Sequence, residues 1–463
     1  MTKKSLKSIL GLLLLLISSF PKLTYGQEQL LIQNVHVISM TDHQILKNQQ
    51  VFIKEGKIQS ISPSSPDIKA FSANTTIIDG KGNFLLPGLS EMHSHIPITE
   101  NGDFSYVQDV MWLYLANGVL NVRGMIGHPS HLELKRRIAT GEITGPRIFA
   151  AGPSLNGNTV ESPESGAAMV RTQKAAGYDH LKLHPGLDIP RFEAIAKTAQ
   201  EVGILFGGHI SLDVGLHESL TKGYKSVEHM DGYIEAMIAD KERLDPQVAG
   251  PFSMLLVKEA DKGRFPELLE LSLQTGAWIA PTLTLFERFF GYIPADEFRL
   301  EPEMRYMPGL QVQQWVNQKK LLESQGILKE ENVKPYLEFR KELLLKLHQG
   351  GVPVILSSDS PQVFNVPGFS LHNEIKSMHE AGMSPMEILK SGTVNVAKYF
   401  DREGEFGVIQ EGVSADLLLV NGNPLEDLSA LRNLQGIVLR GIWIDQATLQ
   451  EQLKKIEQKN LRK

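Results

Sequence analysis

The middle of the chain alternates short apolar runs with amphipathic stretches, whereas both ends carry short segments in which apolar and polar residues alternate. Strand-like runs that alternate with helix-like stretches are typical of a parallel α/β fold. The apolar runs predict eight strands, at residues 88–95, 119–123, 147–151, 180–183, 205–209, 226–229, 278–282 and 353–358. Eight such units favour a closed TIM (β/α)8 barrel, which we assign to residues 87–403.

The amphipathic stretches between these strands, such as residues 190–202 and 372–381, follow a helical period. About seventy residues separate the last two predicted strands, far more than one crossover connection needs. Within that gap, residues 310–349 are charged and helix-periodic, which predicts an inserted pair of helices. The charged tail, residues 448–463, predicts a further helix that we expect to be solvated.

Both ends of the chain carry β-like segments. Residues 30–61 contain a predicted hairpin with Gly56 at its turn, and residues 415–444 contain further strand-like runs. The simplest assembly is one small β-sandwich domain built from both chain ends, residues 27–86 and 404–447.

The chain begins with three lysines among its first seven residues, followed by an apolar run at residues 9–17 and small residues up to Gly26. This order predicts a secretory signal peptide at residues 1–26 and an exported protein, periplasmic or secreted. The apolar run is too short to cross a bilayer of ~30 Å as a helix. We therefore expect no stable membrane insertion after cleavage, and an uncleaved anchor is the alternative.

Composition narrows the classes of function. The 42% apolar and 22% charged residues are ordinary for a globular protein. The formal net charge of −6 provides no basic footprint for a nucleic acid. The absence of cysteine excludes disulfides, thiol catalysis and cysteine-bound zinc. Any metal ion must therefore be bound by nitrogen and oxygen ligands.

His93 and His95 lie at the end of the first predicted barrel strand. Residues i and i+2 of a strand point to one face, and the active sites of this fold lie at the carboxyl ends of the strands. Imidazole suits zinc and similar ions. Taken alone, the pair also fits ordinary surface or core histidines.

His209, His229 and Asp359 end or follow three other predicted strands. Each one alone also fits a structural role, as a core histidine, a capping residue or a helix N-cap. Closure of the barrel would bring all three beside His93 and His95. We therefore predict that these five residues form one metal site.

Lys182 lies in the fourth predicted strand, where burying an ammonium group is costly. Such a lysine can snorkel to solvent or pair with an acid. Alternatively, its neutral amine can capture carbon dioxide as a carbamate, whose two oxygens are able to bridge two cations.

Residues 86–95, with the sequence LPGLSEMHSH, resemble the opening strand of the amidohydrolase superfamily, whose form is apolar-Pro-Gly-x-x-Asp-x-His-x-His. The other candidate ligands match that family's ligand positions in order and strand by strand. Residues 411–417 and 421–425 are similar to its returning β-domain motifs. The resemblance covers roughly residues 30–444, and the nearest branch contains imidazolonepropionase-like proteins and prolidase-like metal-dependent dipeptidases.

The resemblance implies a hydrolase with two divalent ions, zinc first, while nitrogen and oxygen ligation also admits manganese, iron or cobalt. The implied ligands are His93, His95 and Asp359 for the more buried ion, His209 and His229 for the other, and carboxylated Lys182 as a bridge. A metal-activated hydroxide attacks the carbonyl of the substrate. Asp359 takes its proton and passes it to the leaving nitrogen.

Several residues depart from the family pattern. Glu91 stands where Asp is usual, the segment after Arg123 lacks the common aspartate, and Met230 replaces a glycine. His184, on the same strand face as Lys182, can contact substrate or compete as a ligand. The candidate substrate contacts after the strands are His184, Tyr233, His128 and His372, with His131 and Thr282 as further loop candidates.

The expected partner is a small molecule, with a dipeptide or an N-acyl amino acid as first choice; a homo-oligomer is compatible with the sequence. The alternative is a mononuclear hydrolase of a cyclic amide, such as an imidazolone or lactam, without a carboxylated Lys182. An alternative of another class is a non-catalytic barrel that binds a metal or a ligand. The presence of Asp359 argues against that binder.

Overall fold

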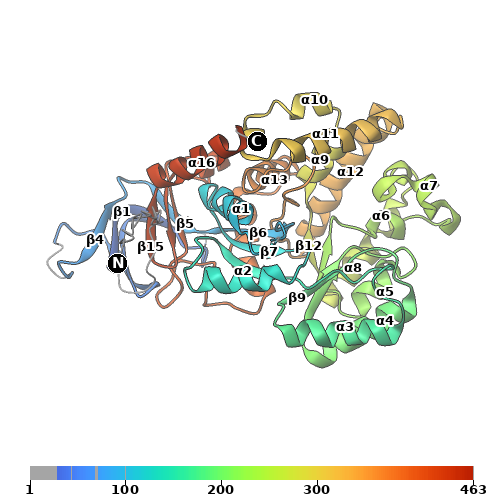
Figure 1. Cartoon of the computed structure of the whole chain (residues 1–463), viewed down its shortest axis with the longest axis horizontal. Helices are drawn as coiled ribbons and strands as arrows, with labels where there is room; N and C mark the ends of the chain where they lie inside the picture. The colour runs from blue at the N-terminus through green and yellow to red at the C-terminus, as the bar shows by residue number, and fades with distance from the viewer. Residues whose placement is uncertain (1–28, 43, 68–70, 100, 462–463) are drawn as a thin grey trace, which may run out of the picture.

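The structure is a computed structural model that describes residues 29–42, 44–67, 71–99 and 101–461. The predicted signal peptide lies outside the described residues. Figure 1 shows a β-sheet at one end of the molecule, a central α/β body beside it and a group of helices above that body. No helix in the described part of the chain is both long enough and apolar enough to cross a membrane.

Seven parallel strands form the central body, in two sheets with the orders β6-β7-β8 and β12-β11-β10-β9. They are β6 (Leu89–Ser94), β7 (Val119–Gly124), β8 (Arg147–Ala150), β9 (His180–Leu183), β10 (Leu205–Gly208), β11 (Ser226–Glu228) and β12 (Trp278–Ala280). Isolated parallel bridges from Ala151 and Leu155 connect the segment after β8 to β9. Seven of the eight predicted barrel strands are thus present, within two residues of the predicted bounds.

The predicted eighth strand, residues 353–358, is not a regular strand. Val354 makes one parallel bridge to β12, and Ser360 makes another to β6. Between them, the N–H of Leu356 donates to the carbonyl of Ser391 instead of to a neighbouring strand, so no continuous ladder forms. The segment still lies between β12 and β6, where an eighth strand was expected.

Helix α4 (Ile189–Val202) illustrates how the predicted helices are delimited. The Asp188 side chain accepts the Arg191 N–H at its start, and Gly203 ends it with a left-handed φ of 65°. The other helices that cover or join the strands are α1 (Ser105–Ala116), α2 (Ser130–Ala139), α3 (Pro163–Ala176), α5 (Gly215–Thr221), α6 (Tyr233–Ala236), α7 (Pro246–Ala249), α8 (Phe265–Thr275), α13 (Phe369–Glu380), α14 (Pro385–Ser391) and α15 (Val394–Tyr399).

The predicted insertion between the last two strand positions is helical. Helices α11 (Gly309–Ser324) and α12 (Glu330–Gln349) confirm the expected pair, and α9 (Leu283–Phe290) and α10 (Ala295–Phe298) precede them. In Figure 1 these helices lie together on one side of the central body.

Strands from both chain ends share one eight-stranded sheet, with the order β15-β14-β13-β5-β1-β2-β3 and with β4 paired to β1. The strands are β1 (Gln29–Ile38), β2 (Ile45–Lys54), β3 (Lys57–Pro63), β4 (Thr75–Asp79), β5 (Phe84–Pro87), β13 (Leu417–Val420), β14 (Leu434–Leu439) and β15 (Ile442–Asp445). The predicted hairpin is β2–β3, with Gly56 at its turn at a φ of 75°. Antiparallel pairing of β5 with β13 joins the two ends of the chain.

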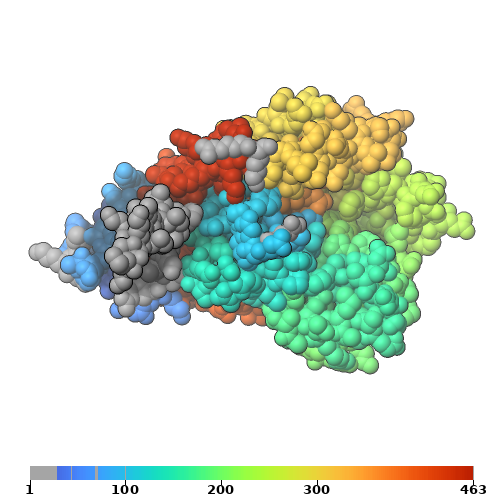
Figure 2. Space-filling model, viewed as in Figure 1, coloured from blue at the N-terminus to red at the C-terminus, as the bar shows by residue number. Residues whose placement is uncertain are grey.

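The C-terminal tail forms the expected helix, α16 (Gln446–Leu461), but the expectation that it is solvated is wrong. Leu449, Leu453 and Ile456 lie on one face and are buried. Leu453 and Ile456 belong to a core cluster with Trp315 of α11. Figure 2 shows the surface of α16, in red, next to that of the inserted helices, in yellow. The expectation was based on the many charged residues of this segment and overlooked the apolar residues spaced four and three positions apart.

Candidate metal centre

The predicted ligands lie at the carboxyl ends of the central strands. His93 is in β6 and His95 follows it, Lys182 is in β9, and His209 and His229 directly follow β10 and β11. The parallel register of β9 and β10 aligns these ends. Gly207 pairs with Lys182 and Gly208 with Leu183, so His209 follows directly beyond the paired residues. Asp359 enters from the irregular segment between β12 and β6.

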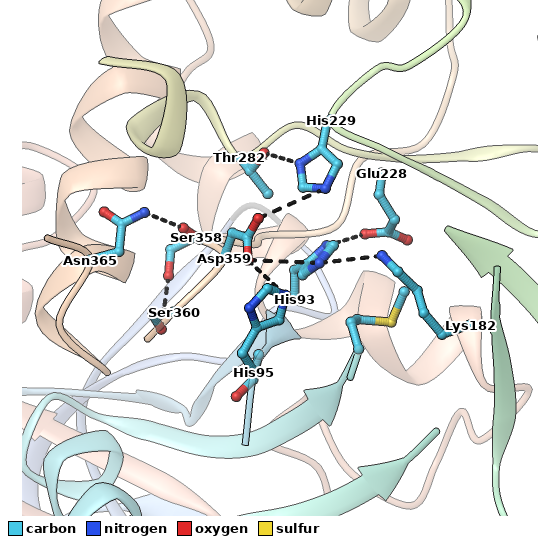
Figure 3. A network of polar contacts seen from close by, with 12 residues as sticks. His93, His95, Lys182, Glu228, His229, Thr282, Ser358, Asp359, Ser360 and Asn365 are labelled. Carbon is cyan, nitrogen blue, oxygen red and sulfur yellow. Dashed lines mark hydrogen bonds and ion pairs between the residues drawn. The ribbon is translucent and has the colours of Figure 1, made fainter. Parts of the chain in front are cut away.

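Asp359 is the centre around which three imidazoles gather (Figure 3). Its Oδ1 atom lies 3.0 Å from His95 Nε2 and 3.9 Å from His93 Nε2. Its Oδ2 atom lies 3.8 Å from His229 Nε2. One ligand atom each from His93, His95 and Asp359 lie within 4.8 Å of one another, a spacing that suits one cation.

His209 and His229 form a second pair beside this group. Their rings stack with centroids 4.7 Å apart, and the His229 ring is also 4.7 Å from that of His93. The side chain of His209 is 16% exposed, as is that of His95, whereas His93 and His229 are almost completely buried. The site therefore meets solvent on the side of His95 and His209.

Lys182 is fully buried at the bottom of the group, with its Nζ atom 3.5 Å from His93 Nε2. Among the described residues, no carboxylate lies within 4.0 Å of this nitrogen, so the lysine has no ion-pair partner. Burial lowers the pKa of Lys182 to about 8. The neutral amine is therefore more accessible near neutral pH than in a solvent-exposed lysine, although the ammonium form still predominates at pH 7.

Hydrogen bonds made by Nδ1 orient three of the four imidazoles. His93 Nδ1 lies 2.7 Å from Glu228, His209 Nδ1 2.7 Å from Asp231, and His229 Nδ1 2.7 Å from the Thr282 hydroxyl. A carboxylate only accepts, so the first two histidines carry their proton on Nδ1 and present the Nε2 lone pair to the site.

Glu228 and Asp231 were missed by the sequence reasoning. Both flank the predicted ligand His229, and an acid next to a candidate metal-binding histidine is the signal that could have indicated them. Thr282 was predicted as a loop contact to substrate, and the structure places it behind His229 instead.

Glu228 belongs to a buried network of charged and polar side chains. Arg123 Nη2 lies 2.9 Å from Glu228 Oε1, and both side chains are fully buried. Arg123 Nη1 donates to Ser226 at 3.0 Å and to Tyr399 at 2.8 Å. This pairing compensates the charge of a carboxylate that lies behind the ligand His93.

Glu91, the residue that departs from the family's aspartate, connects β6 to the Asp359 segment. Its Oε1 atom accepts the backbone N–H groups of His93 and Ser358, each at 2.9 Å, and its other oxygen accepts the Ser358 hydroxyl. Burial raises the pKa of Glu91 to about 7. The longer glutamate thus positions a ligand and the segment that carries Asp359.

The protonation states of the imidazoles suit a cation. Burial lowers the pKa values of His93, His95, His209 and His229 far below the usual range, so the imidazoles are neutral, the form that binds metal. Burial also raises the pKa of Asp359 to about 8, so a cation bound there would have to displace the carboxyl proton.

Asp359 Oδ1 is a buried oxygen without a hydrogen-bond partner among the described residues, and it lies 3.0 Å from His95 Nε2. A cation held between these two atoms would satisfy that oxygen. The residues present therefore fit a metal site.

Of the predicted substrate contacts, His184 lies beside the site, with its ring 5.1 Å from that of His209 and its Nδ1 atom 2.6 Å from Ser154 Oγ. His128 is bonded to Ser130 and lies against His131. The other two are held elsewhere by their own partners.

The hydroxyl of Tyr233, a buried residue, lies 2.6 Å from Ser272 Oγ, inside the helical layer. His372 Nε2 lies 3.1 Å from the Asn117 carbonyl, just before β7 and thus at the amino ends of the strands. The structure does not bring Tyr233 or His372 into the histidine group, because each satisfies its polar atom within the surrounding helices.

The fold and this geometry define an α/β protein with a candidate divalent-metal site at the carboxyl ends of parallel strands. Residues 84–444 match the amidohydrolase family, so the chain belongs to that family and is a hydrolase acting on carbon–nitrogen bonds. The resemblance predicted from the sequence is thereby confirmed.

Known proteins across the family are similar over most of the chain. Ochratoxinase from Aspergillus niger is 22% identical over 449 residues, covering 86% of this chain and 82% of the relative. A Xaa-Pro dipeptidase crystallised with bound methionine superposes with a TM-score of 0.65 at 21% identity, covering 90% of this chain and 100% of that one. Bottromycin amidohydrolase gives a TM-score of 0.70 at 17% identity, with 93% and 90% covered. These two structural likenesses show the fold.

Proposed function

We propose that the chain hydrolyses the amide bond of a dipeptide or an N-acyl amino acid at a centre of two divalent ions, zinc in the first instance. The observation that carries this proposal is the arrangement of His93, His95 and His229, from two strands, with Nε2 atoms within 4 Å of the Asp359 carboxylate. The similarity to a Xaa-Pro dipeptidase supports a dipeptide as the first substrate to try.

The proposed division of ligands follows the distances. The first ion would be bound by His93, His95 and Asp359, and the second by His209 and His229. Bound divalent ions would lower the pKa of a water molecule and polarise the carbonyl of the substrate. The oriented imidazoles keep their lone pairs directed at the ions without rearrangement.

Asp359 would move the proton that amide hydrolysis requires. It takes a proton from the attacking water and gives it to the leaving nitrogen, because an amine is a poor leaving group until it is protonated. Burial raises the pKa of Asp359 when no ion is bound, and cations beside the carboxyl would favour the ionised form that accepts the proton.

Lys182 would bridge the two ions as a carbamate. Its neutral amine would add to carbon dioxide, forming an N–C bond and releasing one proton, and the product would carry one negative charge shared by two oxygens. The absence of an ion-pair partner for this buried lysine within the described residues supports the proposal.

A mononuclear site for a cyclic amide is the second candidate. The compact group His93, His95 and Asp359 favours it, because these three residues are sufficient for one ion without Lys182. A non-catalytic metal-binding barrel is the candidate of another class.

Elemental analysis of protein purified without chelators or added metal distinguishes these candidates, followed by a panel of dipeptides, N-acyl amino acids and lactams. Two ions per chain with dipeptide or N-acyl amino acid turnover that is lost in Asp359→Asn supports the main proposal. One ion with lactam turnover supports the second candidate. Occupied metal sites with no turnover of any substrate support the binder, and no metal uptake rejects all three.

We also propose that the central strands and the segment at residues 353–360 close into a (β/α)8 barrel, and that the terminal sheet folds as a sandwich. Closure is supported by the isolated bridges that join the segment after β8 to β9, Val354 to β12 and Ser360 to β6. Export to the periplasm or the medium remains a proposal that rests on residues 1–26.

A further inference from the structure

A strained turn lies next to the second pair of histidines. In the short 3-10 segment η2 (Pro251–Leu256), Phe252 and Ser253 have φ values of 51° and 55°. Residues other than glycine rarely adopt this left-handed backbone conformation, and two such residues in succession are rarer still. Such strain persists only where the surroundings impose it, and it gathers at functional sites.

Contacts from three directions hold this turn. The Tyr336 hydroxyl of the inserted helix α12 donates to the Phe252 carbonyl at 3.3 Å, and the Ser253 hydroxyl donates to Glu235. The Phe252 ring meets Phe286 of α9 edge-on, with centroids 5.1 Å apart and planes at 84°. Both the backbone and the ring are therefore fixed by neighbouring residues.

The turn directs the Phe252 ring at the candidate ligands of the second ion. Its centroid lies 5.9 Å from that of His229 and 6.3 Å from that of His209. Phe286 also contacts His229, at 6.0 Å, but is completely buried, whereas Phe252 is partly exposed. Phe252 is thus the less buried of the two rings that contact His229, and it also contacts His209, a partly exposed candidate ligand.

We infer that Phe252 forms an apolar wall of the substrate pocket beside His209 and His229, and that it selects amides with a flat apolar group, such as phenyl, next to the scissile bond. The inference rests on the proposed function and adds its substrate class. A flat ring buries apolar area against Phe252 and can adopt an offset or edge-on packing. A charged group placed there would lose hydration without gaining a partner.

The test uses two metal-binding probes that differ in one group, acetohydroxamate with a methyl and benzohydroxamate with a phenyl. Their dissociation constants are measured by calorimetry on the zinc-loaded full chain, so no turnover is needed.

The variants are Phe252→Ala and Phe252→Gly. Glycine tolerates the left-handed φ, so the second variant is expected to fold even if the first does not. Phe289→Ala is the control, since Phe289 is a partly buried ring of the same aromatic group for which no ring contact to the histidines is found.

We expect the wild type and Phe289→Ala to bind benzohydroxamate about 10-fold more tightly than acetohydroxamate. Both Phe252 variants should lose this preference while acetohydroxamate affinity stays unchanged. A preference that survives in Phe252→Gly, or that Phe289→Ala also removes, overturns the inference. If the wild type binds both probes tightly but with equal affinity, the role of Phe252 is rejected while the proposed function stands. If neither probe binds, the metal site fails, and the proposed function and this inference fail with it.

Discussion

His93 Nδ1 lies 2.7 Å from Glu228 Oε2, and both side chains are completely buried. The two residues are 135 positions apart in the chain, and Arg123 compensates the charge of Glu228 from its other side. A carboxylate behind a ligand histidine fixes the tautomer and makes the imidazole a stronger donor to metal. The pair therefore links the buried charge network to the candidate metal centre.

Replacing Glu228 by Gln should weaken metal binding and, because it leaves the buried charge of Arg123 uncompensated, should also lower the free energy of unfolding. The amide keeps the shape of the side chain but offers His93 a neutral acceptor, so we expect metal affinity to fall about 10- to 100-fold. Competition with a chromogenic chelator measures this affinity. Tyr399→Phe is the control, because it removes a hydrogen bond to Arg123 but leaves the Glu228–His93 contact in place. Equal affinities for Glu228→Gln and wild type would show that the carboxylate is merely structural.

Replacing Lys182 by Met should reduce the metal content from two ions per chain to one. Methionine fills much of the lysine volume but cannot form a carbamate, so the bridge is lost while the core stays packed. Elemental analysis gives the stoichiometry, and Lys197→Met, at an exposed position of α4, is the control. A Lys182→Met protein with two ions and full activity would refute the bridge.

Glu374 should make the protein less stable as the pH rises. This buried carboxyl group accepts the N–H groups of Leu283 and Thr284 at the start of α9, at 2.9 and 2.7 Å, and burial raises its pKa from 4.5 to about 8. Between these values the folded protein keeps a proton that the unfolded chain has released. The free energy of unfolding therefore falls with rising pH, by at most about 1.4 kcal/mol per pH unit from this group.

Glu374→Gln removes this titration, so its stability relative to wild type should increase from pH 5 to pH 8. Urea unfolding at several pH values gives the difference, and other buried acids cancel because both proteins contain them. A difference that stays constant over this range would mean that Glu374 is ionised in the folded protein.

Lys319 should stabilise the insertion without affecting the metal site. Its buried Nζ atom donates to the carbonyls of Arg288 at 2.7 Å and Gly291 at 2.9 Å, at the end of α9. Lys319→Met leaves these carbonyls without a donor, which should cost about 1–3 kcal/mol of unfolding free energy. Lys320→Met, at the exposed neighbour, should cost less than about 1 kcal/mol. Equal losses in the two variants, measured by urea unfolding, would contradict the role of Lys319.

Much of the architecture could be predicted from local patterns. Seven central strands, the inserted helices and the β2–β3 hairpin follow from apolar period and turn residues, which neighbouring positions encode. The segment at residues 353–358 has the same apolar pattern but forms no continuous ladder, because the N–H of Leu356 donates to Ser391 while only its carbonyl accepts from β6, from the N–H of Met92. The buried face of α16 was likewise hidden among charged positions.

The six candidate ligands could be named from their residue types and their places at strand ends, and the structure brings them together. Their supporting residues could not. Nothing local pairs Glu228 with His93 or Thr282 with His229, because such contacts depend on how separate strands align. For the same reason, Tyr233 and His372 seemed available as substrate contacts until their partners Ser272 and Asn117 were seen.

By itself, the sequence determined the parallel α/β class, the family and the nitrogen and oxygen chemistry of the site, since these depend on residue type and period along the chain. The tertiary structure alone decided which nitrogen of each imidazole faces the site, which acids support the ligands and where Phe252 lies. Those outcomes depend on burial and on distances between residues far apart in sequence, and both exist only once the strands and inserted helices have packed together.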